Sequence, residues 1–244
     1  MGGEVIRKSK IFQFKQFSVD QSGCAMKINT DGVLLGALAE VDEPENILDI
    51  GTGTGVIALM LAQRFENARI DAVEIDRSAA ETAIRNFSNS PFAERVNLYP
   101  VGFEQFFESN PDKKYNLVVS NPPFFINSLK SPKAGKQLAK HADVIFFERL
   151  INTTSVHLTA DGLICLILPI DTAELVSSLA EKANLYQQNN IRIHSFEASE
   201  PHRLIQYFGF KQTSVKGKQF VIYKSVGNYS EEYVKLLKPY FIAF

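Results

Sequence analysis

Short apolar runs alternate with amphipathic stretches along the middle of this chain. The apolar runs have the length and composition of strands, and the stretches between them repeat their apolar residues at helical spacing. The expected strands cover 46–50, 69–75, 95–100, 115–121 and 162–169, and the expected helices cover 55–65, 77–90, 141–158 and 172–184. This alternation predicts an α/β fold, a doubly wound and mostly parallel sheet with helices on both faces.

The pattern changes near residue 190. Three extended segments, 190–197, 203–212 and 218–225, follow one another without a helix between them. We expect at least two of them to pair antiparallel at the end of the sheet. The last stretch, 229–244, has helical spacing, and Ser230 is its expected N-cap.

Residues 1–45 form an N-terminal extension in this interpretation. Alternating phenylalanines within 11–19, together with 24–28, predict a small hairpin. A helix is expected from residue 30, capped by Thr30 or Asp31. We find no repeat, low-complexity segment or linker, so we expect a single domain, 1–244, in which the extension packs on a catalytic core, 46–244.

Composition narrows the function classes. The 244 residues are 45% hydrophobic and 22% charged, and the net charge is -1, as in ordinary soluble globular proteins. No apolar stretch approaches the ~20 residues of a membrane span and no signal peptide is visible, which predicts a cytoplasmic protein. Cys24 and Cys165 lack metal-ligand spacing, so we expect reduced structural thiols and no metal.

Basic residues gather in three segments. Residues 1–27 contain five Lys or Arg and two acids, and residues 201–225 contain five and no acid. Segment 129–141 has no acid and four lysines: Lys130, Lys133, Lys136 and Lys140. Solvated loops explain any one segment, but three of them in a near-neutral chain favour an anionic partner.

Three glycines, Gly51, Gly53 and Gly55, lie between the first core strand and its helix. Such a turn lets a ligand approach the backbone, and NAD, FAD, nucleotides and S-adenosylmethionine all use one. Asp49 comes two residues before the first glycine, where a carboxylate repels a pyrophosphate and attracts an ammonium or a sulfonium. Glu74 ends the second strand, 23 residues after Gly51, where a carboxylate accepts the hydroxyls of a ribose.

The segment LVVSNPPFFIN, 117–127, ends a strand with Asn121 and two prolines, which cannot donate to a sheet. In a doubly wound sheet this strand lies beside 46–50, so Asn121 faces the glycine loop. Its side-chain oxygen and the Pro122 carbonyl can each accept an N–H from an exocyclic amine and so direct the nitrogen lone pair at an electrophile. Phe124 or Phe125 can stack on a flat ring. The alternative interpretation is that Asn121 only ends the strand and that the phenylalanines belong to the core.

The motifs DIGTGTG, VEID and SNPPFF together resemble the class I S-adenosylmethionine-dependent methyltransferases of the Asn-Pro-Pro-Tyr/Phe type, over roughly 46–170. With FKQFSVDQSGCAMKINTDGVLLGALA, nearly the whole chain is similar to the bacterial enzymes that methylate N6 of the adenine beside the anticodon of valine tRNA. The resemblance implies a Rossmann-like fold, S-adenosylmethionine as cofactor and tRNA as substrate. It implies that the cofactor is held by Asp49, Gly51, Gly53 and Glu74, its methionine end by Thr30 and Asp31, and the target base by Asn121, Pro122 and Phe124.

One position departs from the family pattern, and several functions stay open. Gly102 stands where many such enzymes place an Asp against the adenine amine, so backbone groups or Glu104 would substitute.

The alternative functions are guanine N2 methylation of ribosomal RNA and glutamine N5 methylation of a protein such as a release factor. An NAD-dependent dehydrogenase lacks support, because Asp49 opposes phosphates and no catalytic Tyr-Lys or His-Asp pair is evident. We expect a monomer whose four lysines at 130–140 contact RNA.

Overall fold

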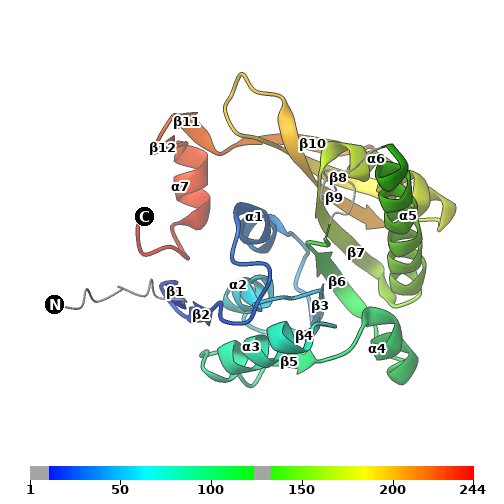
Figure 1. Cartoon of the computed structure of the whole chain (residues 1–244), viewed down its shortest axis with the longest axis horizontal. Helices are drawn as coiled ribbons and strands as arrows, with labels where there is room; N and C mark the ends of the chain where they lie inside the picture. The colour runs from blue at the N-terminus through cyan, green and yellow to red at the C-terminus, as the bar shows by residue number, and fades with distance from the viewer. Residues whose placement is uncertain (1–10, 124–132) are drawn as a thin grey trace.

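An eight-stranded sheet forms the centre of the molecule (Figure 1). The computed structural model describes residues 11–123 and 133–244, with the backbone alone for 133–141. From one edge to the other the strands are β10 (Lys216–Val221), β8 (Tyr186–His194), β9 (Pro201–Gly209), β7 (Leu158–Leu168), β6 (Tyr115–Ser120), β3 (Asn46–Ile50), β4 (Arg69–Val73) and β5 (Val96–Tyr99).

The winding of the sheet reverses beside β3. This strand pairs in parallel with β4 on one side and with β6 on the other, and β5 and β7 extend the parallel part outward. The carboxyl ends of β3 and β6 are therefore neighbours, as predicted. In doubly wound sheets this reversal point is where ligands bind.

The C-terminal part of the sheet is antiparallel. β9 runs antiparallel to both β7 and β8, which confirms the predicted antiparallel pairing. The third extended segment behaves differently, because β10 pairs in parallel with β8. The chain passes from β9 across β8 before β10 begins, so β10 occupies the outer edge of the sheet.

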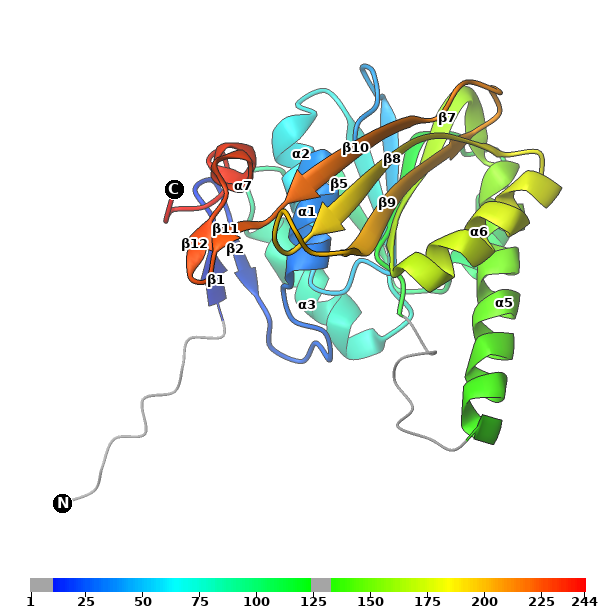
Figure 2. The ribbon, with the colours of Figure 1, turned by 90° about the horizontal axis from the view of Figure 1, so that it is seen from above.

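Helices cover both faces of the sheet (Figures 1 and 2). One face packs against α1 (Thr30–Leu38), α2 (Val56–Arg64), α3 (Arg77–Ser88) and α7 (Glu231–Leu237). The other face packs against α4 (Phe103–Ser109), α5 (Lys133–Ser155) and α6 (Ile170–Lys182). Two details differ from expectation. α5 begins eight residues before the expected 141, and α4, with seven residues, is too short to show a helical period.

The N-terminal hairpin lies within Ile11–Asp20. β1 (Ile11–Gln13) pairs antiparallel with β2 (Ser18–Asp20), so the predicted use of residues 24–28 as its second strand was wrong. The turn between β1 and β2 is closed by Phe14, whose N–H donates to the Phe17 carbonyl at 2.8 Å. The two phenylalanine rings stack at 4.4 Å and are buried against the core, so local packing decides the pairing.

The caps of the two terminal helices can be compared with their predictions. Asn29 caps α1 by accepting from the Gly32 N–H at 2.8 Å, so the prediction of Thr30 or Asp31 was wrong by one or two positions. Ser230 caps α7 by accepting from the Tyr233 N–H at 3.0 Å, as predicted. A short hairpin, β11 (Tyr223–Ser225) and β12 (Asn228–Tyr229), precedes α7. None of the helices within 11–123 and 133–244 is long and apolar enough to cross a membrane.

Candidate active site

A cavity of about 420 Å³ opens where β3, β4, β5 and β6 end. This volume lies within the range of ~300–1,000 Å³ that is usual for small-molecule sites. The predicted site residues that line it are Gly51, Gly53, Glu74, Asn121 and Pro122. Residues far apart in the sequence therefore meet at the reversal point of the sheet.

The glycine loop forms the floor of this cavity. Gly51, Gly53 and Gly55 have φ angles of +72°, +58° and +83°, which L-residues with a side chain rarely adopt. A Cβ on Gly51 or Gly53 would meet no atom of the described residues within 4 Å, so both positions face open space. A Cβ on Gly55 would lie 2.3 Å from the Phe87 ring. The first two glycines thus leave room for a ligand, whereas the third allows α2 to pack on α3.

Glu74 joins the glycine loop to the end of β4. Its Oε2 accepts from the Gly53 N–H at 2.9 Å and its Oε1 accepts from the Asp76 N–H at 2.8 Å. Only 9% of Glu74 is exposed, and the exposed part faces the cavity. Each carboxylate oxygen has a second lone pair, so the group can also accept hydrogen bonds from ligand hydroxyls.

Asp49 lies behind the loop and is not among the residues that line the cavity. It is fully buried, and its Oδ2 accepts from the Thr52 hydroxyl at 2.6 Å. Burial raises the pKa of Asp49 to about 7; the Glu74 charge adds to this rise, and the Thr52 hydrogen bond opposes it. Alternation along β3 explains the placement, because Leu48 and Ile50 point to the opposite face. Any effect of Asp49 on a cationic ligand therefore acts through the loop.

Asn121 stands at the wall of the cavity opposite Glu74. The preceding Ser120 donates from its hydroxyl to the Ile50 carbonyl at 2.7 Å, which ties the end of β6 to the end of β3. Pro122 is buried and Pro123 is exposed. This arrangement holds the start of the Asn-Pro-Pro segment beside the glycine loop.

Some predicted residues lie elsewhere or beyond the described part. Phe124 and Lys130 fall outside the described residues, and Lys133, Lys136 and Lys140 belong to a stretch of α5 described by its backbone alone. Thr30 and Asp31 begin α1 and do not line the cavity. Asp31 instead accepts from Arg203 Nε at 2.8 Å, which joins α1 to β9. The predicted role of Thr30 and Asp31 at a cofactor's methionine end stays a prediction.

Sequence reasoning missed the apolar wall of the cavity. Ile75 is 79% exposed although it is large and apolar, and it lines the cavity with Val101, Phe103 and Phe146. The sequence signal that could have predicted this placement of Ile75 is its position directly after Glu74. Exposed apolar surface of this kind is suited to the flat face of a base.

Two further features concern polar groups near this wall. Gly102 is the N-cap of α4, and Glu104 in the first turn of that helix lines the cavity, as an adenine contact would require.

Another side of the cavity is closed by residues Cys24, Ala25 and Met26. Burial raises the pKa of the Cys24 thiol, which favours its protonated form. Within the described residues, no group of three His, Cys, Asp or Glu is arranged to hold a metal.

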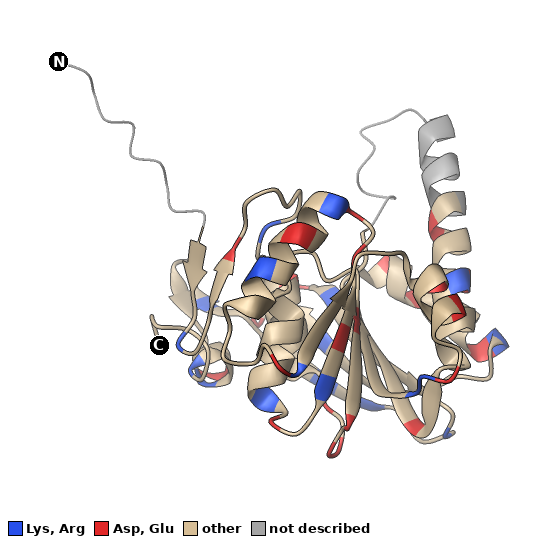
Figure 3. Cartoon of the chain, turned by 90° about the horizontal axis from the view of Figure 1, so that it is seen from below, with Lys and Arg blue, Asp and Glu red and all other residues tan. Residues whose placement is uncertain are grey.

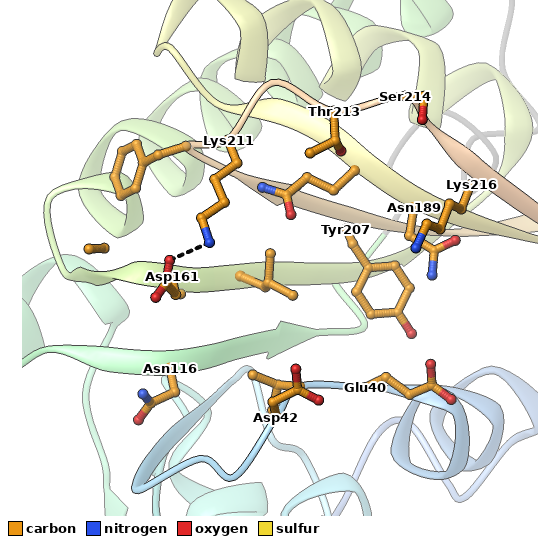
Figure 4. Close-up of a pocket in the computed structure, with 16 residues that line it drawn as sticks. Glu40, Asp42, Asn116, Asp161, Asn189, Tyr207, Lys211, Thr213, Ser214 and Lys216 are labelled. Atoms are coloured by element: carbon orange, nitrogen blue, oxygen red, sulfur yellow. Dashed lines mark ion pairs between the residues drawn. The ribbon is translucent and has the colours of Figure 1, made fainter.

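A larger cavity, about 670 Å³, lies at the other end of the strands, near the starts of β6, β7 and β8. Figure 4 shows the residues that line it. Asn116 near the start of β6 lines it, whereas Asn121 follows the end of that strand. Lys211 pairs with Asp161 at 2.8 Å there, and Glu40 and Asp42 line the wall formed by the loop before β3. None of the predicted site residues lines this cavity, so we do not place the chemistry there.

Lys or Arg and Asp or Glu are both distributed along the described helices, strands and loops in Figure 3. Of the three basic segments, only 201–225 is described completely. It includes the exposed residues Lys211, Lys216, Lys218 and Lys224.

Comparison with known proteins agrees with this geometry. Residues 26–169 match the family described as "Methyltransferase small domain". A relative from Pedobacter heparinus is 47% identical over 233 residues, which cover 96% of this chain and 98% of the relative. One from Flavobacterium psychrophilum is 40% identical, covering 95% and 99%. A third, from Bacteroides fragilis, is 38% identical, covering 95% and 97%. All three are named "tRNA1(Val) (adenine(37)-N6)-methyltransferase".

Solved structures show the same fold at low sequence identity. A predicted O-methyltransferase from Agrobacterium tumefaciens superposes with a TM-score of 0.67 at 19% identity, covering 86% of this chain and 96% of that one. A ribosomal protein L11 methylase from Lactobacillus delbrueckii gives 0.52 at 15% identity, covering 74% and 78%. These likenesses concern the arrangement of sheet and helices.

Proposed function

Because the chain belongs to the methyltransferase small domain family, we propose that it transfers a methyl group from S-adenosylmethionine to N6 of adenine 37 in valine tRNA. The observation that carries the proposal is that Asn121 and Pro122 share one cavity with the glycine loop and Glu74. One wall suits a nucleoside cofactor, and the other suits an exocyclic amine.

The residues of the cavity fit S-adenosylmethionine. Gly51 and Gly53 leave the floor open, and the partly satisfied carboxylate of Glu74 can accept the ribose hydroxyls. Ile75 offers apolar surface to the adenine, and Glu104, which lines the same cavity, can accept from its amine. When bound, the cofactor supplies an electrophilic methyl group on a positively charged sulfur.

Asn121 and Pro122 position the amine that receives the methyl group. The Asn121 side-chain oxygen and the Pro122 carbonyl each accept one N–H of the adenine amine. This turns the nitrogen lone pair, otherwise conjugated into the ring, toward the methyl group. The nitrogen forms one bond to carbon and releases one proton to water, while the bond from carbon to sulfur breaks. Neither oxygen is a strong base, so positioning provides most of the effect.

The names of the relatives support adenine 37 of valine tRNA as the target. A base in an anticodon loop is unpaired, so it enters a narrow pocket at a cost of only a few kcal/mol. We place Phe124 on the face of that base and the lysines of 130–140 on RNA phosphates. We place this tRNA-modifying activity in the cytoplasm, and we expect the protein to act as a monomer.

The test offers unmodified valine tRNA, ribosomal RNA and a release-factor protein to the purified enzyme with radiolabelled S-adenosylmethionine. Nucleoside analysis should find N6-methyladenosine in the tRNA alone, and none in a tRNA with guanine at position 37. Full-length tRNA should be a far better substrate than its isolated loop, which lacks most phosphate contacts. N2-methylguanosine in ribosomal RNA, or methylglutamine in the protein, would assign the enzyme to one of the two alternatives.

A further inference from the structure

A third, smaller cavity of about 270 Å³ lies between α6 and the strands β8 and β9. Figure 2 shows α6 beside these two strands. Three side-chain amides line the cavity, from Gln187, Asn190 and Gln206. Amides on a sheet normally face water, but Gln206 is only 1% exposed and Asn190 only 7%. Such a buried set of amides is unusual because burial of polar groups is unfavourable unless they are hydrogen-bonded.

The hydrogen bonds of these amides are incomplete. Gln206 Nε2 donates to the Ser177 hydroxyl at 2.8 Å and to Gln187 Oε1 at 3.1 Å, which fixes the orientation of the Gln206 amide. Gln206 Oε1 and Asn190 Oδ1 contact no hydrogen-bond donor among the described residues. Two buried acceptors in one cavity, that of Gln206 with a fixed orientation, suit a ligand that presents N–H groups.

The mouth of the cavity carries one charge of each sign, because Arg192 and Glu174 both line the cavity and are both exposed. Arg192 is exposed, lines the cavity and follows Asn190 by two residues on β8, so the two side chains share one face. On the neighbouring β10, Gly217 adds no side chain. A Cβ there would lie 3.4 Å from Asn190 Oδ1 and 3.5 Å from Arg192 Nη1. The glycine therefore keeps this entrance free.

The chemistry of the walls matches a nucleobase. Amide groups read the donor and acceptor edges of bases, and arginine binds phosphate. Ile170 and Leu204 supply apolar surface, and the exposed Glu174 carboxylate at the mouth can accept from an amino group of a base. The volume of 270 Å³ is below the ~300–1,000 Å³ of sites for larger ligands. It suits one base, with its phosphate outside at Arg192.

The sheet places this cavity within reach of Asn121. Ser120 of β6 pairs with Leu166 of β7, and Leu166 pairs with Gln206 of β9. Gln206 is therefore level with the residue that precedes Asn121, two strands away. Neighbouring strands are ~4.8 Å apart, so Gln206 lies about 10 Å from β6 across the sheet, and the entrance at β8 and β10, three to four strands away, lies roughly 14–19 Å from β6. A few unstacked nucleotides of a loop span these distances.

We propose that this cavity binds one unpaired base near the adenine that is methylated, and so helps to select the RNA. This inference rests on the proposed function. Sequence-specific recognition of RNA mostly uses unpaired bases that are splayed out and read at their edges. The cavity is separate from the pocket for the cofactor and the target base, and it acts through substrate affinity.

The experiment measures kcat/KM for valine tRNA transcripts in which single anticodon-loop bases near adenine 37 are replaced. The wild-type enzyme should lose activity by a factor of about 10 to 100 at one position, the loss typical of one base contact. Gly217→Leu should fill the entrance, and Gln206→Leu should remove the base contact. Both variants should raise KM for the native tRNA, treat native and replaced bases alike, and bind S-adenosylmethionine as the wild type does.

Gln212→Leu is the matched control, because Gln212 is exposed in the loop after β9 and does not line the cavity. It should keep the discrimination. If Gln206→Leu fails to fold, Gly217→Leu decides, since Gly217 is exposed and its φ is not positive. Full discrimination by Gly217→Leu would overturn the inference and leave only water in the cavity. A wild-type enzyme that methylates valine tRNA without discrimination would overturn it too, whereas no methylation of any tRNA would refute the proposed function itself.

Discussion

The carboxylate of Glu74 accepts a hydrogen bond from the backbone N–H of Gly53 at 2.9 Å, across 21 positions of the sequence. The bond joins the end of β4 to the loop that follows β3. Since the same carboxylate lines the cavity, one side chain both shapes the glycine loop and faces the ligand.

Glu74→Gln should therefore weaken cofactor binding, and it should also lower the free energy of unfolding by about 1–3 kcal/mol because one backbone N–H loses its acceptor. Glutamine has the same size, but one of its two ends is a donor, so it cannot accept from Gly53, Asp76 and a ribose together. A hydrogen bond to a charged group contributes ~1.5–3 kcal/mol, so we expect the Kd for S-adenosylmethionine to rise by about 10 to 100 fold in calorimetry. Glu81→Gln, on the exposed face of α3, is the control. Equal affinities for the two variants would contradict the assigned role.

Gly51→Ala and Gly55→Ala should fail in different ways. Both residues have positive φ, which costs an alanine ~1–2 kcal/mol. The new methyl group at 51 meets open space, so this variant should fold and bind S-adenosylmethionine poorly. At 55 it would lie 2.3 Å from the Phe87 ring, so the free energy of unfolding should fall by a further ~1–3 kcal/mol. Urea unfolding and calorimetry separate the two. Wild-type affinity in Gly51→Ala would show that the cofactor does not approach this floor.

Asn121→Ala should lower turnover by a factor of about 100 or more, because the lost acceptor orients the amine in the transition state. S-adenosylmethionine affinity should stay nearly unchanged. Single-turnover methylation of tRNA and calorimetry measure the two effects. Asn89→Ala, an exposed position after α3, serves as the control. Near wild-type turnover in Asn121→Ala would reduce this residue to a strand terminator.

Asp49 should make the protein less stable as the pH rises. Its pKa is about 7 in the folded protein and ~3.9 in the unfolded chain. Between these values the folded state binds more protons, so the free energy of unfolding falls with rising pH, by at most ~4 kcal/mol. Urea unfolding at pH 5 and pH 8 should show this fall in the wild type and a smaller one in Asp49→Asn. An identical fall in Asp49→Asn would assign the effect to other groups, and Asp112→Asn, at an exposed position, is the control.

Lys133→Glu with Lys136→Glu should weaken tRNA binding and spare cofactor affinity. Each lost phosphate contact should lower the slope of log K against log salt by ~0.7–0.9. The control is Lys235→Glu with Lys238→Glu, which places the same two charges three positions apart at exposed sites in and after α7. Filter binding at several salt concentrations gives both slopes. An equal loss in the control would mean that net charge alone, and not this segment of α5, governs the affinity.

Local signals explain how much of this protein is predictable from its sequence. Hydrophobic period, glycine spacing and the Asn-Pro-Pro segment act within a few residues, and they identify the parallel strands, the glycine loop and Asn121. The winding rule of doubly wound sheets then brings Gly51, Glu74 and Asn121 to one edge. These parts of the prediction agree with the structure because each depends on neighbouring residues or on a general rule of topology.

Tertiary contacts decided the rest. The stacking of Phe14 on Phe17 selects the hairpin. The alternation of side chains along β3 places the buried Asp49 carboxylate behind the glycine loop, whereas the sequence predicted that it would contact the ligand. Asp31 finds Arg203 across 172 positions, and Gln206 meets Gln187 and Ser177 only because β9 lies between β7 and β8. The sequence by itself determined the elements and the chemistry at the ends of β3, β4 and β6. Only the folded chain decided which polar groups are buried together, since that depends on contacts between residues whose separation along the chain has no local signature.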